Sequence, residues 1–279
     1  MLFLKTLSTR RNSLNICKTH RFGTCCNDDD RTMIVTEVNV KSILSKSKVM
    51  DYTINPYLGC AHGCIYCYAR FMKRFTTHRE PWGSFVDVKI NAIDLLRQEI
   101  RKKRVGKVWM SGVCDPYQPI EKDYEITKRC LALLSNGAWP VTIQTKSPLV
   151  LRDINLLKQF SDIEVGLTIT TADETIRQLF EPNSPPIQQR IGALERLKAV
   201  GITTFAMIAP ILPKTNDLVA QLSGKVDYVL IDKMNYHYAD WIYRKHEFEH
   251  AKTYDFFTRK KIELANALEA KDIPCQFLF

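Results

Sequence analysis

The chain has 279 residues, 45% of them hydrophobic, and a formal net charge of +10. This length fits one sizeable α/β domain, and no apolar run approaches the eighteen or so residues of a membrane span, so we expect a soluble protein. Its nine cysteines are an odd number, which argues against a secreted disulfide framework and for a reducing, cytoplasmic location.

Residues 1–32 carry Lys and Arg among Ser and Thr, with no acidic residue before Asp28. This composition fits an organelle transit peptide, and it fits a disordered tail or an over-extended start equally well. The predicted domains are therefore this tail, a barrel domain over residues 33–245, and a C-terminal helix and tail over residues 246–279 that pack on the barrel.

A short strand at residues 51–55 leads into the loop NPYLGCAHGCIYCYAR, which contains Cys60, Cys64 and Cys67. A [4Fe–4S] cluster is closed by one cysteine per iron, so three thiolates leave one iron open to an outside ligand. The alternative is a zinc ion with His62 or His78 as the fourth ligand. Zinc is the weaker reading because structural zinc sites usually add a second, distant cysteine pair.

From residue 51 onward, short apolar runs alternate with amphipathic ones, which predicts a parallel sheet with helical connections. The expected helices include one from residue 65 to residue 76, two that start at the Ser-Pro pairs of residues 147–148 and 184–185, and one near the C-terminus. The predicted barrel strands are residues 51–55, 107–111, 141–145, 164–170, 203–208 and 226–231. The fold class is α/β, a partial (β/α)6 TIM-like barrel with a short N-terminal extension.

Working residues of such a barrel lie in the loops at the carboxyl ends of its strands. The cysteine loop occupies such a position after the first strand. The segments SGVCDPYQPIE, TKS, TITTAD and PILP follow the next four strands, and each is more polar or turn-rich than a simple connection requires.

These segments together resemble the radical S-adenosylmethionine (SAM) superfamily, in particular the group of spore photoproduct lyase and DNA repair photolyase-like proteins. The resemblance covers roughly residues 40–240 and rests on the cysteine loop, SGVCDPYQPIE, TKS, and the EP…R pattern of Glu181, Pro182 and Arg190. It implies a [4Fe–4S] cluster that binds SAM. Reductive cleavage of SAM would then give methionine and a 5′-deoxyadenosyl radical that abstracts hydrogen from a substrate.

The resemblance also implies roles for single residues. Tyr66, before the last cysteine, is expected against the adenine of SAM. Ser111 and Gly112 are expected at the amino group, with Asp115 close behind. Lys146 is the candidate for the methionine carboxylate, since a cation matches that anion.

Thr168 or Thr170 is expected at the ribose, and Arg190 at the polar end of SAM. The alternative for these side chains is a hydrogen bond at a strand end or a helix cap. Cys114 corresponds to a cysteine that returns hydrogen to the product radical in spore photoproduct lyases, although its spacing from the Asp differs, and the alternative is a buried packing residue.

The implied partners are an electron donor, such as flavodoxin or ferredoxin, and a substrate for which nucleic acid is the leading class. The alternative function is a non-catalytic nucleic-acid-binding protein stabilised by zinc or a cluster. A dense basic run fits either a phosphate-binding patch or the solvated end of a helix. It comprises Arg97, Arg101, Lys102, Lys103, Arg104 and Lys107.

Aromatic residues follow the sixth predicted strand, at Tyr236, His237, Tyr238 and Trp241. They would either line the substrate entrance, where aromatic rings stack on bases, or pack against the C-terminal helix. We expect the packing role.

Overall fold

The computed structural model describes residues 33–279, and the predictions for residues 1–32 lie outside it. Its main sheet has eight strands in the order β11-β10-β9-β8-β7-β6-β3-β2, all parallel to their neighbours except β2. The strands are β2 (Leu44–Lys46), β3 (Tyr52–Ile54), β6 (Val108–Met110), β7 (Val141–Thr145), β8 (Ile163–Thr168), β9 (Thr203–Ile208), β10 (Tyr228–Ile231) and β11 (Cys275–Phe277).

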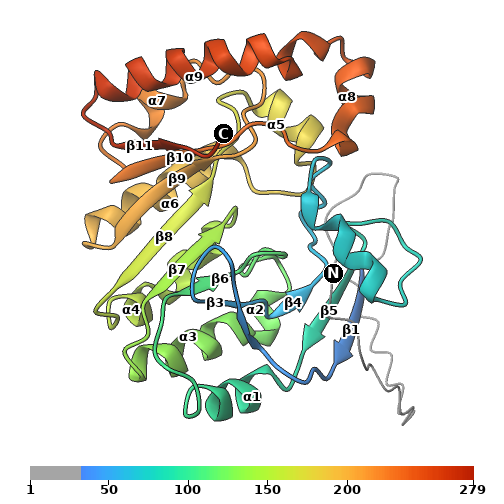
Figure 1. Cartoon of the computed structure of the whole chain (residues 1–279), viewed down its shortest axis with the longest axis vertical. Helices are drawn as coiled ribbons and strands as arrows, with labels where there is room; N and C mark the ends of the chain where they lie inside the picture. Colours follow the sequence, from blue (N-terminus) through green and yellow to red (C-terminus); the bar gives the residue numbers. More distant parts are fainter. Residues whose placement is uncertain (1–32) are drawn as a thin grey trace.

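Helices cover the outside of this curved sheet, with α9 along the top and α1 and α3 at the bottom in Figure 1. The α-helices are α1 (Ala92–Glu99), α2 (Glu121–Tyr124), α3 (Ile126–Asn136), α4 (Ile154–Leu157), α5 (Glu174–Phe180), α6 (Ile187–Ala199), α7 (Leu218–Leu222), α8 (Asp240–Lys245) and α9 (Tyr254–Glu269). The 3-10 helices are η1 (Tyr68–Phe75), η2 (Pro148–Asp153), η3 (His237–Ala239) and η4 (Glu249–Lys252).

The central strands β7 and β8 are buried on both faces, as expected for a parallel sheet between helices and a filled interior. All six predicted barrel strands are present and parallel, so the prediction of a partial TIM-like barrel is confirmed. The structure adds β11, which pairs with β10 and extends the sheet with residues from the C-terminal segment. None of the helices between residues 33 and 279 has the length and apolarity needed to span a bilayer.

A second, smaller sheet was not predicted. It has the order β1-β5-β4, formed by β1 (Ile34–Val38), β5 (Phe85–Lys89) and β4 (Tyr57–Leu58). Strand β4 opens the cysteine loop, so this sheet supports the loop from outside the barrel.

Two local predictions differ from the structure. The chain after Cys67 forms the 3-10 helix η1 instead of an α-helix. Ser147 caps η2 as predicted, by accepting a hydrogen bond from the backbone N–H of Leu149. Ser184, in contrast, does not cap α6, because its hydroxyl donates to the Glu181 backbone carbonyl and carboxylate instead.

Candidate active site

The three cysteines of the loop lie on one cavity of about 630 Å³, at the carboxyl end of the barrel strands. Cys60 and Cys64 are buried and Cys67 is partly exposed. Burial raises the pKa of Cys64 to about 12, although Lys146 opposes the shift. The thiols therefore hold their protons at neutral pH, and a metal must displace them to bind.

Close backbone packing shapes the cysteine loop. Gly63 and Gly83 have positive φ angles of 59° and 103°, a backbone conformation that residues with a Cβ atom rarely adopt. A Cβ on Gly83 would lie 2.8 Å from the Cα of Gly63. The segment around Gly83 is thus pressed against the loop that carries the cysteines.

The two histidines proposed as zinc ligands are directed elsewhere. His62 Nε2 lies 3.2 Å from Asp115, and its Nδ1 lies 3.4 Å from the Asn183 carbonyl. The ring nitrogens of His78 face Glu80 and Asp87. Within residues 33–279, no three His, Cys, Asp or Glu side chains converge as ligands of one metal ion. The ligands of a cluster stand farther apart, because each cysteine binds a different iron.

Asp115 joins the cysteine loop to the end of β7. Its carboxylate accepts hydrogen bonds from the Thr145 hydroxyl at 2.6 Å and from the backbone N–H groups of Lys146 and Tyr117 at 2.7 and 2.9 Å. Burial alone would raise the pKa of Asp115, but its charge interaction with His62 and these hydrogen bonds outweigh burial and hold it at about 2. Asp115 lines the cavity, yet its carboxylate oxygens already accept hydrogen bonds from other residues of the protein.

Asn55 organises the loop after β6, a role that the sequence analysis missed although the residue stands in the quoted motif. Its Oδ1 accepts hydrogen bonds from the Ser111 hydroxyl at 2.7 Å and from the backbone N–H groups of Gly112 and Val113 at 2.9 Å. The Ser111 Oγ also lies 3.0 Å from the Cys114 Sγ. Ser111, Gly112 and Cys114 all line the cavity.

Lys146 and Tyr66 lie beside the cysteines on the cavity wall. The Lys146 Nζ is 5.7 Å from the centre of the Tyr66 ring and 3.9 Å from the Glu181 carboxylate. The Tyr66 hydroxyl donates to that same carboxylate. Burial alone would lower the pKa of Lys146, but the negative charges of Glu181 and of Cys64 in its thiolate form outweigh it and raise the pKa, so the ammonium keeps its charge when Cys64 is deprotonated.

The remaining predicted SAM contacts separate into two groups. Thr168 lines the cavity, and its Oγ1 accepts a hydrogen bond from Gln144 Nε2 at 3.3 Å. Thr170 is not part of the cavity wall and donates to Glu181 at 3.0 Å. Arg190 is fully buried and pairs with Glu181 at 2.6 Å. The contact of Arg190 with SAM stays a prediction, and in this structure its guanidinium pairs with Glu181 and does not line the cavity.

The sequence model of the radical SAM superfamily matches residues 54–221 of the chain. It belongs to that superfamily. The radical SAM chain is 36% identical over 258 residues to an uncharacterized protein of Methanocaldococcus jannaschii, across 86% of the chain and 95% of that relative. It is 30% identical over 206 residues to an uncharacterized protein of Mycobacterium bovis, of which it covers 60%.

Solved structures with the same fold include a spore photoproduct lyase complexed with dinucleoside spore photoproduct, with a TM-score of 0.67, 12% identity and coverage of 89% of this chain and 82% of that one. Streptococcus suis SuiB bound to its precursor peptide SuiA has a TM-score of 0.54 at 16% identity, over 81% of this chain and 47% of that one. At these identities the likeness establishes the radical SAM fold and not the substrate.

Buried donors around the cysteines fit the cofactor that the superfamily implies. The Arg70 Nε and the Trp82 Nε1 are buried without a hydrogen-bond partner among the described residues. Arg70 also donates to the Cys64 carbonyl at 3.3 Å, and both Arg70 and Trp82 oppose the rise that burial causes in the pKa of Cys67. Sulfur atoms of a bound cluster would give these N–H groups acceptors, so the residues present fit a [4Fe–4S] cluster held by the three cysteines.

An aromatic rim, consisting of Tyr68, Tyr236 and Tyr238, stands beside the cavity of this radical SAM protein, and Tyr68 and Tyr236 line the cavity itself. Tyr236 stacks on Tyr68 across a centroid distance of 6.1 Å and on Tyr238 across 5.9 Å, and the Arg70 guanidinium lies 5.7 Å from the Tyr238 ring. All three tyrosines are 40% or more exposed. The expected packing of Tyr236 and Tyr238 against the C-terminal helix is therefore wrong.

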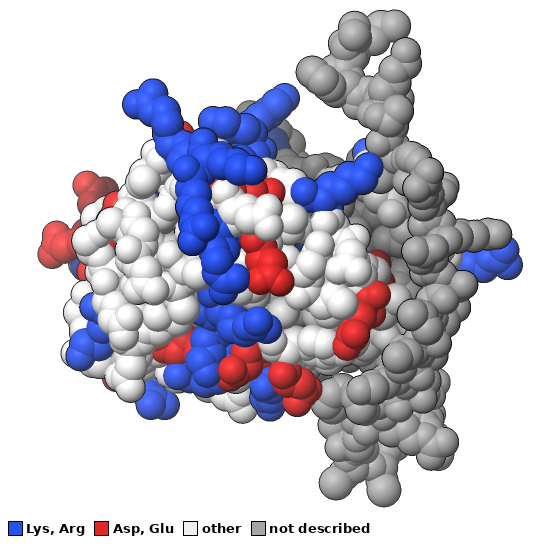
Figure 2. Space-filling model, turned by 90° about the horizontal axis from the view of Figure 1, so that it is seen from below, with Lys and Arg blue, Asp and Glu red and all other residues white. Residues whose placement is uncertain are grey.

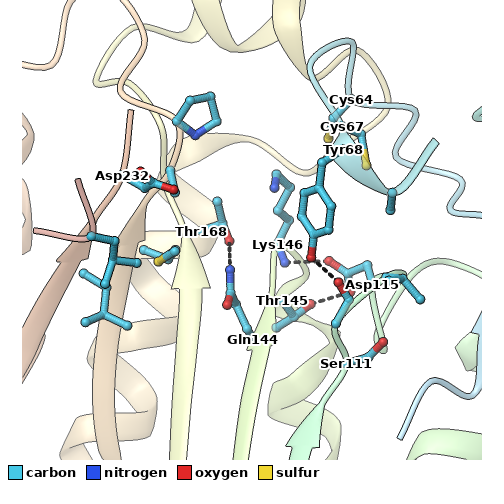
Figure 3. Close-up of a pocket in the computed structure, with 18 of the residues that line it drawn as sticks. Cys64, Cys67, Tyr68, Ser111, Asp115, Gln144, Thr145, Lys146, Thr168 and Asp232 are labelled. Atoms are coloured by element: carbon cyan, nitrogen blue, oxygen red, sulfur yellow. Dashed lines mark hydrogen bonds between the residues drawn. The ribbon is translucent and has the colours of Figure 1, made fainter. Parts of the chain in front are cut away.

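Figure 3 shows Cys64, Cys67 and Tyr68 on one side of the cavity, Asp232 on the opposite side, and Lys146 and Thr168 between them. Asp232, Gln144 and Tyr68 line the cavity, although the sequence analysis gave none of them a role. Gln144 and Asp232 lie at the carboxyl ends of β7 and β10, and Tyr68 directly follows Cys67. These positions in the sequence could have marked the three residues as candidates for the site.

The basic run lies away from this cavity. It extends from α1 to the start of β6, hence at the amino end of the strands, whereas the cavity opens at their carboxyl ends. Figure 2 shows a band of Lys and Arg on the face seen from below, where α1 and α3 lie in Figure 1. Two residues of the run form salt bridges with nearby carboxylates, Arg97 with Asp94 and Lys103 with Glu99. This favours the interpretation of the run as the solvated end of a helix.

Proposed function

We propose that this radical SAM protein is an enzyme that binds one [4Fe–4S] cluster through Cys60, Cys64 and Cys67 and cleaves SAM reductively. The observation that carries the proposal is that these three cysteines share one cavity with the charged Lys146 and the thiol of Cys114. When bound and reduced, the cluster supplies the electron that splits SAM into methionine and a 5′-deoxyadenosyl radical. A flavodoxin or ferredoxin in a reducing cytoplasm fits as the source of that electron.

Lys146 would bind the carboxylate of SAM. Its ammonium is placed next to the cysteines and keeps its charge because Glu181 and the thiolate form of Cys64 raise its pKa. A buried ammonium makes a strong charge-assisted hydrogen bond with a carboxylate. Tyr66 is held by Glu181 and would flank the adenine, Ser111 and Gly112 the amino group, and Thr168 the ribose.

Cys114 would return a hydrogen atom to the product radical. Burial raises the pKa of its thiol to about 11, so the S–H bond is intact at neutral pH. In this step the S–H bond breaks, a C–H bond forms on the product, and the unpaired electron moves to sulfur. Replacing Cys114 with Ala should leave SAM cleavage intact and change the distribution of products, and unchanged products would return Cys114 to a packing role.

Nucleic acid is the substrate class we propose. The aromatic rim supports it, because exposed tyrosines bind unpaired bases by stacking. The net charge of +10 and the fold shared with a spore photoproduct lyase that binds a dinucleoside photoproduct agree with it. The basic run does not contribute, since it lies at the other end of the barrel.

Anaerobic reconstitution with iron and sulfide tests the enzyme. We expect the visible absorbance of a [4Fe–4S] cluster, four irons per chain, and 5′-deoxyadenosine after reduction in the presence of SAM. Changing Cys60, Cys64 or Cys67 to Ala should abolish all three. Colourless protein with stoichiometric zinc would instead support the non-catalytic nucleic-acid-binding protein.

The substrate class is tested by measuring SAM cleavage with and without single-stranded and duplex DNA and RNA, damaged and undamaged. Stimulation by one of them is the expected result. If none of them changes the rate or the products, the nucleic-acid proposal fails while the enzyme proposal stands.

A further inference from the structure

Helix η1 presents an exposed surface immediately beside the cysteines. Phe71 is 38% exposed and Phe75 is 59% exposed. The Arg74 guanidinium lies over both rings, at 5.4 Å from the centre of Phe71 and 4.7 Å from that of Phe75. We call Phe71, Arg74, Phe75 and the exposed Arg79 the η1 face.

The η1 face is strongly basic. Between Tyr68 and Arg79 there is no Asp or Glu, and Lys73, Arg74 and Arg79 give this surface its charge. The fourth basic residue of the stretch, Arg70, donates to the Cys64 carbonyl instead. Lys73 Nζ donates to the Arg79 carbonyl at 2.9 Å, so its charge stays on this surface. Glu80 follows next, and its carboxylate faces His78 at 3.2 Å.

The face is close to the cysteines but turned away from the cavity. A 3-10 helix rises about 2 Å per residue, so Phe71 lies about 8 Å along the axis from Cys67. Tyr68 and Ala69 of the same helix line the cavity, whereas Phe71, Arg74 and Phe75 do not. One helix thus separates the reaction cavity from an exposed basic and aromatic surface.

We propose that the η1 face is the docking surface for an acidic one-electron carrier protein, an inference that rests on the cluster of the proposed function. A substrate must reach the cavity, but an electron donor needs only a short distance to the cluster. An apolar centre surrounded by charge is typical of protein interfaces, and a basic face accelerates the approach of an acidic partner.

The step that occurs at this face is a single electron transfer. The carrier's reduced cofactor is oxidised by one electron and the cluster is reduced by one, without transfer of a proton or a group. Because the face points away from the cavity, the carrier and the substrate can be bound together.

The test compares charge reversal on this face with the same change elsewhere. The variant is Arg74→Glu with Arg79→Glu, and the matched control is Arg101→Glu with Arg104→Glu, which are exposed residues at the other end of the barrel. The reconstituted holoproteins, without SAM, are reduced by photoreduced flavodoxin or by dithionite. Reduction is followed as loss of visible absorbance at low and high salt.

We expect at least a tenfold slower reduction of the η1-face variant by flavodoxin at low salt, a size typical of lost electrostatic steering. The difference should shrink at high salt, because salt screens exposed charges. Reduction by dithionite should be the same in all three proteins, and the control variant should match the unmodified chain with both reductants.

Four results would overturn the inference: unchanged reduction of the variant by flavodoxin, equal slowing of both variants, slowing with dithionite as well, or no reduction of the unmodified chain by flavodoxin. Loss of single-stranded oligonucleotide binding with normal reduction would assign the face to nucleic acid instead. Failure of the proposed function looks different, since then the unmodified chain holds no cluster or releases no 5′-deoxyadenosine with dithionite.

Discussion

Glu181 is the residue on which the wall of the cavity depends. It is fully buried, accepts hydrogen bonds from Tyr66, Thr170 and Ser184, and pairs with Arg190. Burial alone would raise the pKa of Glu181, but Arg190 and Lys146 outweigh it and hold it at about 2. A carboxylate with so many donors stays ionised inside the protein.

We predict that Glu181→Gln destabilises the fold by about 3–5 kcal/mol at neutral pH, because it leaves the Arg190 guanidinium buried without its counter-charge. Urea unfolding measures this. The control is Glu195→Gln, an exposed position on α6, for which the change should stay within about 0.5 kcal/mol.

The pH dependence of stability follows from the same carboxylate. Its folded pKa of about 2 is below the ordinary value of 4.5, so its stabilisation is complete above that ordinary value and is lost as the pH falls towards 2. The free energy of unfolding should therefore decrease over this range in the unmodified chain, and less steeply in Glu181→Gln. Equal slopes would show that other groups carry the acid sensitivity.

Trp82 offers a prediction for the proposed cluster. Its indole N–H is buried, has no acceptor among the described residues and lies near Cys67. Hydrogen bonds to cluster sulfurs influence the reduction potential, and a donor favours the more negative, reduced state. Trp82→Phe should therefore lower the reduction potential of the cluster. A tenfold decrease in the equilibrium constant for its one-electron reduction corresponds to a shift of about 59 mV.

A redox titration followed by the paramagnetic signal of the reduced cluster measures that potential. The matched control is Trp241→Phe, since this indole is exposed. An identical potential in Trp82→Phe and the unmodified chain would show that the indole makes no bond to the cluster.

At the scale of elements, the cysteine loop depends on its contact with the segment around Gly83. We predict that Gly83→Ala destabilises the protein and reduces the iron bound after reconstitution, because its Cβ would lie 2.8 Å from the Cα of Gly63 and the φ angle is unfavourable. The control is Gly192→Ala, in α6, where the added Cβ meets nothing within 4 Å. That change should stabilise the helix by about 0.5–1 kcal/mol. Iron content and thermal unfolding of both variants check the prediction.

The strands were predictable from sequence because a parallel barrel strand is a short apolar run, and Val141–Thr145 and Thr203–Ile208 match the expected bounds. Side-chain roles were harder, because they depend on partners far away in sequence. Ser184 has the sequence of a helix cap, yet Glu181 takes its hydroxyl. The pairing of Arg190 with Glu181 was not predicted for the same reason, since nothing in the local sequence shows that the two side chains form a buried ion pair.

At the scale of the molecule, the two ends of the barrel differ in character. The carboxyl end holds the cysteines and the aromatic rim, and the amino end holds the basic run. The shared fold does not choose a substrate, since similar folds hold a dinucleoside in one structure and a precursor peptide in another. The side chains around the entrance must therefore supply the selectivity.

We predict that Tyr236→Ala weakens binding of a single-stranded oligonucleotide by about 1–3 kcal/mol, the usual loss for one base stacked on an aromatic ring. Arg101→Glu with Arg104→Glu should change binding little. Fluorescence anisotropy at one fixed salt concentration compares the two, because affinity for nucleic acid depends strongly on salt. The opposite pattern would place nucleic acid at the amino end of the barrel and separate it from the cavity.

Strand β11 has a consequence for biosynthesis. Its residue Gln276, and Leu278 just beyond it, line the same cavity as the cysteines, although they are translated long after the cysteine loop. The cysteine loop therefore leaves the ribosome before β10 can pair with β11. Because the cavity wall is complete only after this pairing, we expect the proposed cluster to load best onto chains that contain β11.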